Sequence, residues 1–210
     1  MISNNSKAVD SYFAFDNKFR QEGYSVIAGI DEAGRGCLAG PVVAACVSFK
    51  EPVFIKGIRD SKELSSEERE SLFEEIIKYA FVGIGIVDVN LIDRINILEA
   101  TRLAMIQAFE KLGKKVELLL IDALELPNIK IPQKNIIKGD QKSASIAAAS
   151  IIAKVTRDRI MCDYHKVYSN YGFNKHKGYA TKEHLSALKK FGPSPIHRKS
   201  FSSVRQLVLF

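Results

Sequence analysis

The apolar residues of this chain gather in short runs that alternate with longer segments of helical spacing. The short runs are rich in Val, Ile, Leu and Ala and are bounded by polar or glycine-containing segments. Runs of this length and composition predict buried β-strands. The first two strands follow one another closely enough to form a hairpin. The predicted strands are 25–31, 40–49, 81–89, 116–122 and a short one at 135–138.

The longer segments carry signals for helix starts. Ser65 followed by Glu68 is a capping box, and Asn96 followed by Glu99 is a second N-cap signature. We expect helices from these two caps to about 79 and 112, a long helix at 143–164, helices at 181–191 and 202–209, and a short helix within 1–24. The alternation of strands and helices predicts an α/β domain.

Carboxylates stand at or just past the ends of three predicted strands. Asp31 and Glu32 come at the end of the first strand, Asp122 ends the fourth, and Asp140 follows the short fifth strand. Strand ends are rigid supports that can converge on one pocket. Clustered carboxylates repel one another unless cations intervene, and hard oxygen ligands favour Mg²⁺ or Mn²⁺. The set predicts a two-metal site for phosphodiester hydrolysis, with a structural salt-bridge network as the alternative.

The adjacent pair Asp31 and Glu32 must meet a geometric condition. Neighbours on a strand point to opposite faces, so both can reach one ion only if the pleat breaks between them. We therefore expect Glu32 to lie already in the turn that follows. That turn contains Gly34-Arg35-Gly36, and glycines let backbone N–H groups approach a ligand closely. It predicts a phosphate-binding site beside the metal.

Basic residues are concentrated towards the C-terminal end. Of the net charge of +7, residues 166–210 contribute +8 from nine Lys or Arg and one acid, Glu183, which leaves −1 for residues 1–165. A near-neutral body with a basic tail predicts a polyanionic partner such as nucleic acid. We expect a catalytic domain at 1–165 and a basic helical extension at 166–210 that contributes to substrate binding.

Other features narrow the class of protein. No apolar run reaches membrane-spanning length, and residues 1–5 lack the core of a signal peptide. The three cysteines are scattered, which argues against a disulfide framework or a zinc site and for a reducing compartment. We expect a cytoplasmic monomer that does not bind membranes.

Several blocks of the sequence, in order over about 28–201, resemble the ribonuclease HII family. The blocks are Asp31-Glu32-Ala33-Gly34-Arg35-Gly36, Asp60-Ser61-Lys62, Ile121-Asp122, Lys138-Gly139-Asp140, the segment 145–158 and His176-Lys177-Gly178-Tyr179. The resemblance implies a ribonuclease H-like mixed sheet flanked by helices, with a C-terminal helical extension. It also implies a metal-dependent endonuclease that cleaves the RNA strand of RNA·DNA hybrids. Such an enzyme would nick 5′ of single ribonucleotides embedded in duplex DNA and leave 5′-phosphate and 3′-hydroxyl ends, as in ribonucleotide excision repair and DNA replication.

The resemblance further implies roles for nine residues. The catalytic ligands of Mn²⁺ or Mg²⁺ would be Asp31, Glu32, Asp122 and Asp140. The substrate-binding residues would be Gly34, Arg35 and Gly36 around the ribonucleotide, Lys62 on a backbone phosphate, and Tyr179 under the sugar at the RNA–DNA junction. Recognition of a 2′-hydroxyl is how a protein distinguishes RNA from DNA. The chain departs from the family at Cys37, where many members have proline.

Other polar residues receive structural interpretations. We expect Asp158 to be a helix-surface ion-pair partner and Arg157 to face solvent, and Lys154 either faces solvent or contacts a phosphate. We expect His184 to be an ordinary helix residue and His197 to lie in a solvated basic loop, with a substrate contact as the alternative. The apolar stretch 207–210 either docks a partner or packs on the domain. Two other functions stay open: a non-catalytic protein that binds hybrids, and a nuclease of the same superfold that acts on DNA.

Overall fold

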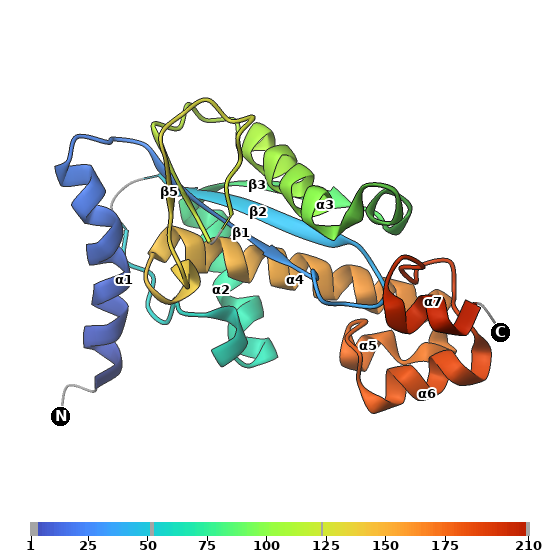
Figure 1. The fold of residues 1–210 in the computed structure, drawn as a ribbon. Coiled ribbons are helices and arrows are strands. Elements are labelled where there is room, and N and C mark those ends of the chain that lie inside the picture. The colour runs from blue at the N-terminus through green and yellow to red at the C-terminus, as the bar shows by residue number, and fades with distance from the viewer. Residues whose placement is uncertain (1–3, 51–52, 123, 209–210) are drawn as a thin grey trace.

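The computed structural model describes residues 4–50, 53–122 and 124–208 (Figure 1). Its centre is a five-stranded mixed sheet in the order β3-β2-β1-β4-β5. β1 pairs antiparallel with β2, and β2 with β3, whereas β1 with β4 and β4 with β5 are parallel pairs. Because β1, β4 and β5 are parallel, they end at the same edge of the sheet. The strands are β1 (Ile27–Ala33), β2 (Val42–Phe49), β3 (Ala80–Val87), β4 (Leu118–Ile121) and β5 (Gln133–Asn135).

Helices cover both faces of this sheet. α3 packs on one face, and α4 packs on the other together with α2 and α1 (Figure 1). Three short helices follow α4, and 3₁₀ turns lie at 61–63, 139–141 and 169–171. This architecture confirms the predicted mixed sheet flanked by helices with helices at the C-terminal end. The helices are α1 (Asn4–Gln21), α2 (Ser66–Tyr79), α3 (Val89–Lys111), α4 (Ala144–Val167), α5 (Phe173–His176), α6 (Lys182–Phe191) and α7 (Ser202–Val208).

The first turns of α4 lie directly against β1. A Cβ atom added at Gly29 would be only 2.2 Å from the carbonyl carbon of Ser145, so this contact requires glycine. Residues 144–153 of α4 are all buried, and most of them are Ala or Ser. Such small side chains let helix and strand backbones approach closely. The packing fixes the N-terminus of α4, and the turn that precedes it, relative to the end of β1.

Several predicted boundaries are wrong, and the short fifth strand lies at Gln133–Asn135 instead of 135–138. β1 continues to Ala33 instead of ending at Asp31, because Glu32 and Ala33 still pair with β2. The helix expected from Asn96 begins earlier, at Val89, where the Asp88 side chain accepts the Leu91 N–H at 2.9 Å. Asn96 has a φ of 67° and interrupts α3, and its Oδ1 accepts the N–H of Leu98 at 2.9 Å. Asn96 is therefore the cap that was predicted, but a helical turn precedes it.

The helices after α4 form their own small core beside the segment that follows β1. Leu38 N–H donates to the Gly178 carbonyl, and Arg198 N–H donates to the Leu38 carbonyl, both at 2.8 Å. The segment that links β1 to β2 is thus held between the loops before α6 and before α7. The side chains of the apolar stretch 207–210 lie outside the described part of the chain.

His184 lies in α6, as expected of a helix residue, whereas the solvated position expected for His197 is wrong; both side chains are fully buried. Their Nε2 atoms are 3.0 Å apart, and His184 Nδ1 is 2.8 Å from the Tyr179 carbonyl. Ser194 N–H donates to His197 Nδ1 at 2.9 Å, so that nitrogen carries no proton and His197 is neutral. His197 Nε2 therefore donates to His184 Nε2, and His184 Nδ1 donates to the Tyr179 carbonyl, so His184 is neutral as well. The neutral pair ties the loop before α7 to the carbonyl of Tyr179. Among the described residues, no helix is long and apolar enough to cross a membrane.

Candidate active site

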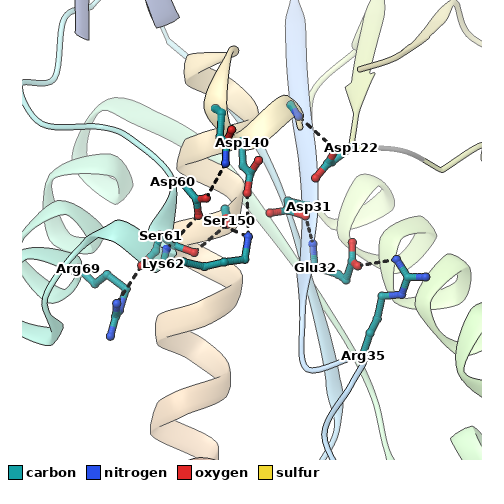
Figure 2. A network of polar contacts seen from close by, with 12 residues as sticks. Asp31, Glu32, Arg35, Asp60, Ser61, Lys62, Arg69, Asp122, Asp140 and Ser150 are labelled. Carbon is teal, nitrogen blue, oxygen red and sulfur yellow. Dashed lines mark hydrogen bonds and ion pairs between the residues drawn. The ribbon is translucent and has the colours of Figure 1, made fainter. Parts of the chain in front are cut away.

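Acidic side chains gather where the three parallel strands end (Figure 2). Asp31 and Asp122 each follow the paired residues Ile30 and Ile121 of the neighbouring strands β1 and β4. Asp140 lies in the 3₁₀ turn between β5 and α4. Asp31 and Asp140 are only 5% and 4% exposed. The strand-end placement predicted from the sequence is therefore present in the fold.

These carboxylates are buried with little positive charge to balance them. Burial and the negative charge of Glu32 raise the pKa of Asp31 well above its usual value. Burial also raises the pKa of Glu32 and of Asp122. Hydrogen bonds offset only part of the cost: Glu32 N–H donates to Asp31 Oδ1 at 2.8 Å, and Gly139 N–H donates to Asp122 Oδ1 at 3.1 Å. A site of this kind favours the arrival of a cation.

Glu32 does not enter the turn as expected. Its backbone pairs with Ala44 in the regular register of β1 and β2, so the pleat continues past Asp31. The Glu32 side chain is directed towards Arg35, whose Nη1 lies 3.1 Å from Glu32 Oε1 (Figure 2). In the part of the chain that the structure describes, no three Asp, Glu, His or Cys side chains converge closely enough to hold an ion.

Lys62 supplies the cation on the other side of the cluster. Its Nζ lies 2.9 Å from Asp140 Oδ2 and 3.4 Å from Asp60 Oδ1. Burial alone would lower the pKa of Lys62, but the hydrogen bond to Asp140 and the negative charges of Asp140, Asp60 and Asp31 together outweigh burial, and the pKa is raised. The Asp140 position therefore accommodates a positive charge already. Oxygen-only donors that are short of countercharge fit a hard divalent ion such as Mg²⁺ or Mn²⁺.

Two serines and one further aspartate support the cluster and were not predicted. Ser150 of α4 hydrogen-bonds to Asp31 and lies 2.9 Å from Ser61, measured between Oγ atoms. Asp60 is buried and accepts the Lys62 N–H at 3.0 Å. Asp60 and Ser61 belong to one sequence block with Lys62. They are far from the other acidic residues in the chain, so no local sequence pattern predicts that they lie together.

The Gly34-Arg35-Gly36 turn lies just beyond the acids. Gly34 has a φ of 98°, and a Cβ added there would meet Arg157 Nε at 2.1 Å, so only glycine is compatible with this position. Arg35 and Gly36 are exposed, and a Cβ at Gly36 would meet no atom within 4 Å. The outer side of the turn is therefore open to a ligand, as a phosphate-binding turn requires.

Tyr179 lies beside this turn and contacts the residue that follows it. Its side chain is 43% exposed, and its hydroxyl hydrogen-bonds with the thiol of Cys37, which directly follows the turn. Its ring centroid is 5.9 Å from the Arg157 guanidinium carbon and 5.5 Å from Lys154 Nζ. The fold thus joins Tyr179 to the turn, although 143 positions separate Tyr179 from Gly36 in the chain.

The exposed position that the sequence predicted for Arg157 is wrong. This residue is 0% exposed and lies beneath the turn together with the equally buried Arg198. The neighbouring residues in the sequence did not predict the burial of either arginine, because a buried arginine occurs in the same helix and loop sequences as an exposed one. Asp158 is an ion-pair partner, as predicted. Its partner is Lys154 at 2.8 Å, which was expected to face solvent, and both side chains are less than a quarter exposed.

Comparisons of the sequence and of the fold with known proteins all find ribonucleases H of type 2 or type 3. The family model described as Ribonuclease HII matches residues 28–204. A Ribonuclease HII from Caldanaerobacter subterraneus subsp. tengcongensis is 55% identical over 196 residues, which is 93% of this chain and 81% of that protein. The crystal structure of the ribonuclease H2 from Pyrococcus horikoshii OT3 has a TM-score of 0.72 at 27% identity and covers 87% of this chain and 96% of that one. Bst-RNase HIII in complex with Mn²⁺ has a TM-score of 0.72 at 18% identity, over 88% of this chain and 69% of that one, and shows the shared fold.

Proposed function

This chain belongs to the ribonuclease HII family and is a type 2 ribonuclease H, and from that premise we propose that it nicks duplex DNA on the 5′ side of a single embedded ribonucleotide. It also cleaves the RNA strand of longer RNA·DNA hybrids and leaves 5′-phosphate and 3′-hydroxyl ends. Its substrates are the ribonucleotides that ribonucleotide excision repair and DNA replication must remove. The observation that carries the proposal is the gathering of carboxylates at the common edge of β1, β4 and β5, where Asp31 is buried without an ion pair among the described residues.

The proposed catalytic residues are the four carboxylates. Asp31, Asp122 and Asp140, with Glu32 at their margin, would hold Mg²⁺ or Mn²⁺ once their side chains turn towards a common point. Such ions would supply a hydroxide from water and offset charge on the leaving oxygen. Asp140 would then give up its ion pair with Lys62, whose ammonium would lie next to the site and be available to a backbone phosphate.

The turn and Tyr179 are proposed to select the ribonucleotide. The open side of Gly34-Arg35-Gly36 receives the 2′-hydroxyl and its flanking phosphate, and Tyr179 stacks under the sugar at the junction. The half-exposed ring and the exposed Gly36 support this assignment. Residues 1–165 form the catalytic part, and the basic residues of 166–210 add attraction for the phosphate backbone.

A cleavage assay tests the proposal. A duplex with one ribonucleotide is incubated with the protein in Mg²⁺, in Mn²⁺ and in EDTA, beside an all-DNA duplex of the same sequence. Nicking only of the ribonucleotide duplex, and only with metal, is the expected result. Binding of that duplex without any nicking would favour a non-catalytic binder, and cleavage of the all-DNA duplex would favour a DNA nuclease.

The protein is also proposed to act as a monomer in the cytoplasm. Cys37, Cys46 and Cys162 are all free thiols, which is consistent with a reducing compartment. Sedimentation at several protein concentrations tests the monomer, since a dimer would sediment faster as concentration rises.

A further inference from the structure

Two fully buried arginines lie under the Gly34-Arg35-Gly36 turn. Arg157 of α4 donates to the carbonyls of Pro41, Ala39 and Lys177, at 2.8–3.0 Å. Arg198 lies before α7, and both guanidinium groups are 0% exposed. They approach the turn from two different elements, α4 and the loop before α7, and both donate to carbonyls of the segment that links β1 to β2.

Arg198 holds one peptide group of the turn in a fixed orientation. Its Nη1 donates to the Arg35 carbonyl at 2.9 Å, while its Nε and Nη2 both donate to the Gly40 carbonyl at 3.0 and 2.8 Å. In a trans peptide the C=O and the following N–H point in opposite directions. Because the Arg35 carbonyl points inwards to Arg198, the Gly36 N–H points outwards, to the open side of the turn.

Neither guanidinium forms an ion pair with a carboxylate among the described residues, although the charge of Asp93 acts on Arg198 from beyond ion-pair distance. All the hydrogen-bond acceptors of Arg157 and Arg198 are neutral carbonyl oxygens, and no ion pair joins either to a carboxylate. Burial and the charge of Arg157 lower the pKa of Arg198 to about 10, so Arg198 remains charged at neutral pH. Buried charge without a counterion is costly and favours an anion nearby.

We propose that Arg157 and Arg198 are positioning residues that preorganise the turn for a phosphate of the nucleic acid. Arg198 turns the Arg35 carbonyl away from the ligand and the Gly36 amide towards it, and Arg157 supports Gly34 from below. The two buried charges make the site attractive to the phosphate group beside the ribonucleotide. This inference rests on the proposed function, since it assigns the turn to the ribonucleotide.

The test compares two affinities of one protein preparation in EDTA, where no cleavage occurs. The probes are a duplex with one embedded ribonucleotide and the all-DNA duplex of the same sequence. Their affinity ratio does not depend on the fraction of folded protein, so a merely structural defect leaves it unchanged. The variants are Arg198→Lys and Arg157→Lys, which keep the charge but cannot make the same three hydrogen bonds.

A matched control is Arg159→Lys. Arg159 also lies on α4, but it is 47% exposed and pairs with Glu70 and Glu74 of α2, away from the turn. We expect Arg198→Lys and Arg157→Lys to lower the affinity ratio about tenfold, the size of one missing charge-assisted hydrogen bond. Arg159→Lys keeps the ratio of the unaltered protein.

An unchanged ratio in both variants would overturn the positioning role. If the arginine variants do not fold, Gly36→Ala takes their place, because its Cβ meets no atom and the fold tolerates it. A methyl group in front of the outward amide should lower the ratio by a similar factor, and an unchanged ratio would again contradict the inference. Equal affinity of the unaltered protein for both duplexes would overturn this inference alone, whereas the proposed function fails only if the unaltered protein does not nick the ribonucleotide duplex with metal.

Discussion

At the scale of single residues, the electrostatics of the site depend on which of its carboxylates have a cationic side chain as a partner. Asp140 is neutralised by Lys62, and Glu32 by Arg35. Asp31 and Asp122 receive hydrogen bonds from backbone N–H groups and Ser150 but no ion pair among the described residues. These two aspartates therefore have the most to gain from a divalent ion.

Asp122→Asn should abolish cleavage and spare binding. The side-chain amide oxygen of the variant can still accept the Gly139 N–H, so the end of β4 keeps its geometry. The loss of a charged ligand should reduce the cleavage rate by more than about a hundredfold, since even residues that only orient ligands cost roughly 10–100-fold. A cleavage gel and fluorescence anisotropy with the ribonucleotide duplex give the two readouts. Retention of near-normal cleavage would remove Asp122 from the catalytic set.

Lys62→Gln should increase the response of the protein to metal. Without the ammonium, Asp140 loses its cation, and Mg²⁺ no longer competes with Lys62 for that carboxylate. Because a ligand that binds only the folded state raises its stability, the melting temperature should rise more with Mg²⁺ in the variant than in the unaltered protein. Lys111→Gln, at the exposed end of α3, is the control. Equal shifts in all three proteins would show that Lys62 does not compete with the ion.

Tyr179→Ala should impair cleavage at a single ribonucleotide more than cleavage of a long hybrid. Base or sugar stacking on an aromatic ring is worth about 1–3 kcal/mol, so the junction substrate should lose about tenfold or more in kcat/KM. Tyr179→Phe keeps the ring and removes only the hydrogen bond with Cys37, and it should stay close to normal. Equal losses on both substrates would contradict a role at the junction.

At the scale of elements, the helices after α4 are bound to the turn through buried polar groups. The pair His184 and His197 connects the loop before α7 to the Tyr179 carbonyl, and Arg198 connects that loop to the turn. Phe173 and Tyr171 stack in parallel beside these rings, with centroids 5.3 Å apart. The arrangement makes the position of Tyr179 depend on the integrity of α6 and of the loop that follows it.

Acid should weaken this part of the fold. Burial lowers the pKa of His184 and of His197 to about 4, from 6.5. Between these values the unfolded state binds more protons than the folded state, so stability is lost as pH falls from about 6.5 towards 4. The raised pKa values of Asp31 and Asp122 have the opposite effect on stability. The free-energy cost of burying these two charges disappears as the carboxylates take up protons, so their contribution to stability rises as pH falls.

A substitution at His197 separates the effect of the buried histidines on acid stability from that of the aspartates. His197→Gln removes one titrating ring and leaves the carboxylates unchanged. Melting temperatures between pH 7 and pH 4 should therefore fall less steeply in the variant than in the unaltered protein. Identical slopes would mean that the buried histidines do not control acid sensitivity.

At the scale of the whole molecule, charge is distributed unevenly over the fold. The extension at 166–210 carries +8, whereas the rest of the chain is close to neutral. Figure 1 shows α5, α6 and α7 grouped at one end of the sheet, beyond the C-terminal half of α4. Polyanion attraction should therefore be strongest at that end, next to the turn and Tyr179.

Charge reversal on α6 should weaken binding in a salt-dependent way. Lys189 and Lys190 are exposed, and Lys189→Glu with Lys190→Glu should lower the slope of log affinity against log salt by about one for each phosphate that is no longer neutralised. The measurement is anisotropy with a long RNA·DNA hybrid at several salt concentrations. Lys111→Glu on α3 serves as the control. A slope that does not change would place the nucleic acid elsewhere on the surface.

The sequence by itself determined most elements of the fold and the identity of the acidic residues. Hydrophobic periodicity and caps such as Ser65 and Asn96 are local, because they depend on neighbours within a few positions. The motif blocks around Asp31, Asp122 and Asp140 were also readable, since each combines a strand end with a carboxylate. Boundaries were less certain where, as at Glu32, pairing with another strand extends an element.

Only the tertiary structure decided which charges meet. The ion pair between Lys62 and Asp140 spans 78 positions, and the bond from Arg198 to the Arg35 carbonyl spans 163. Such contacts depend on the register of β1 with β4 and on the close approach of α4 to Gly29. No local pattern encodes these distances, because the same arginine or histidine is compatible with a surface or a buried position until the whole chain has packed.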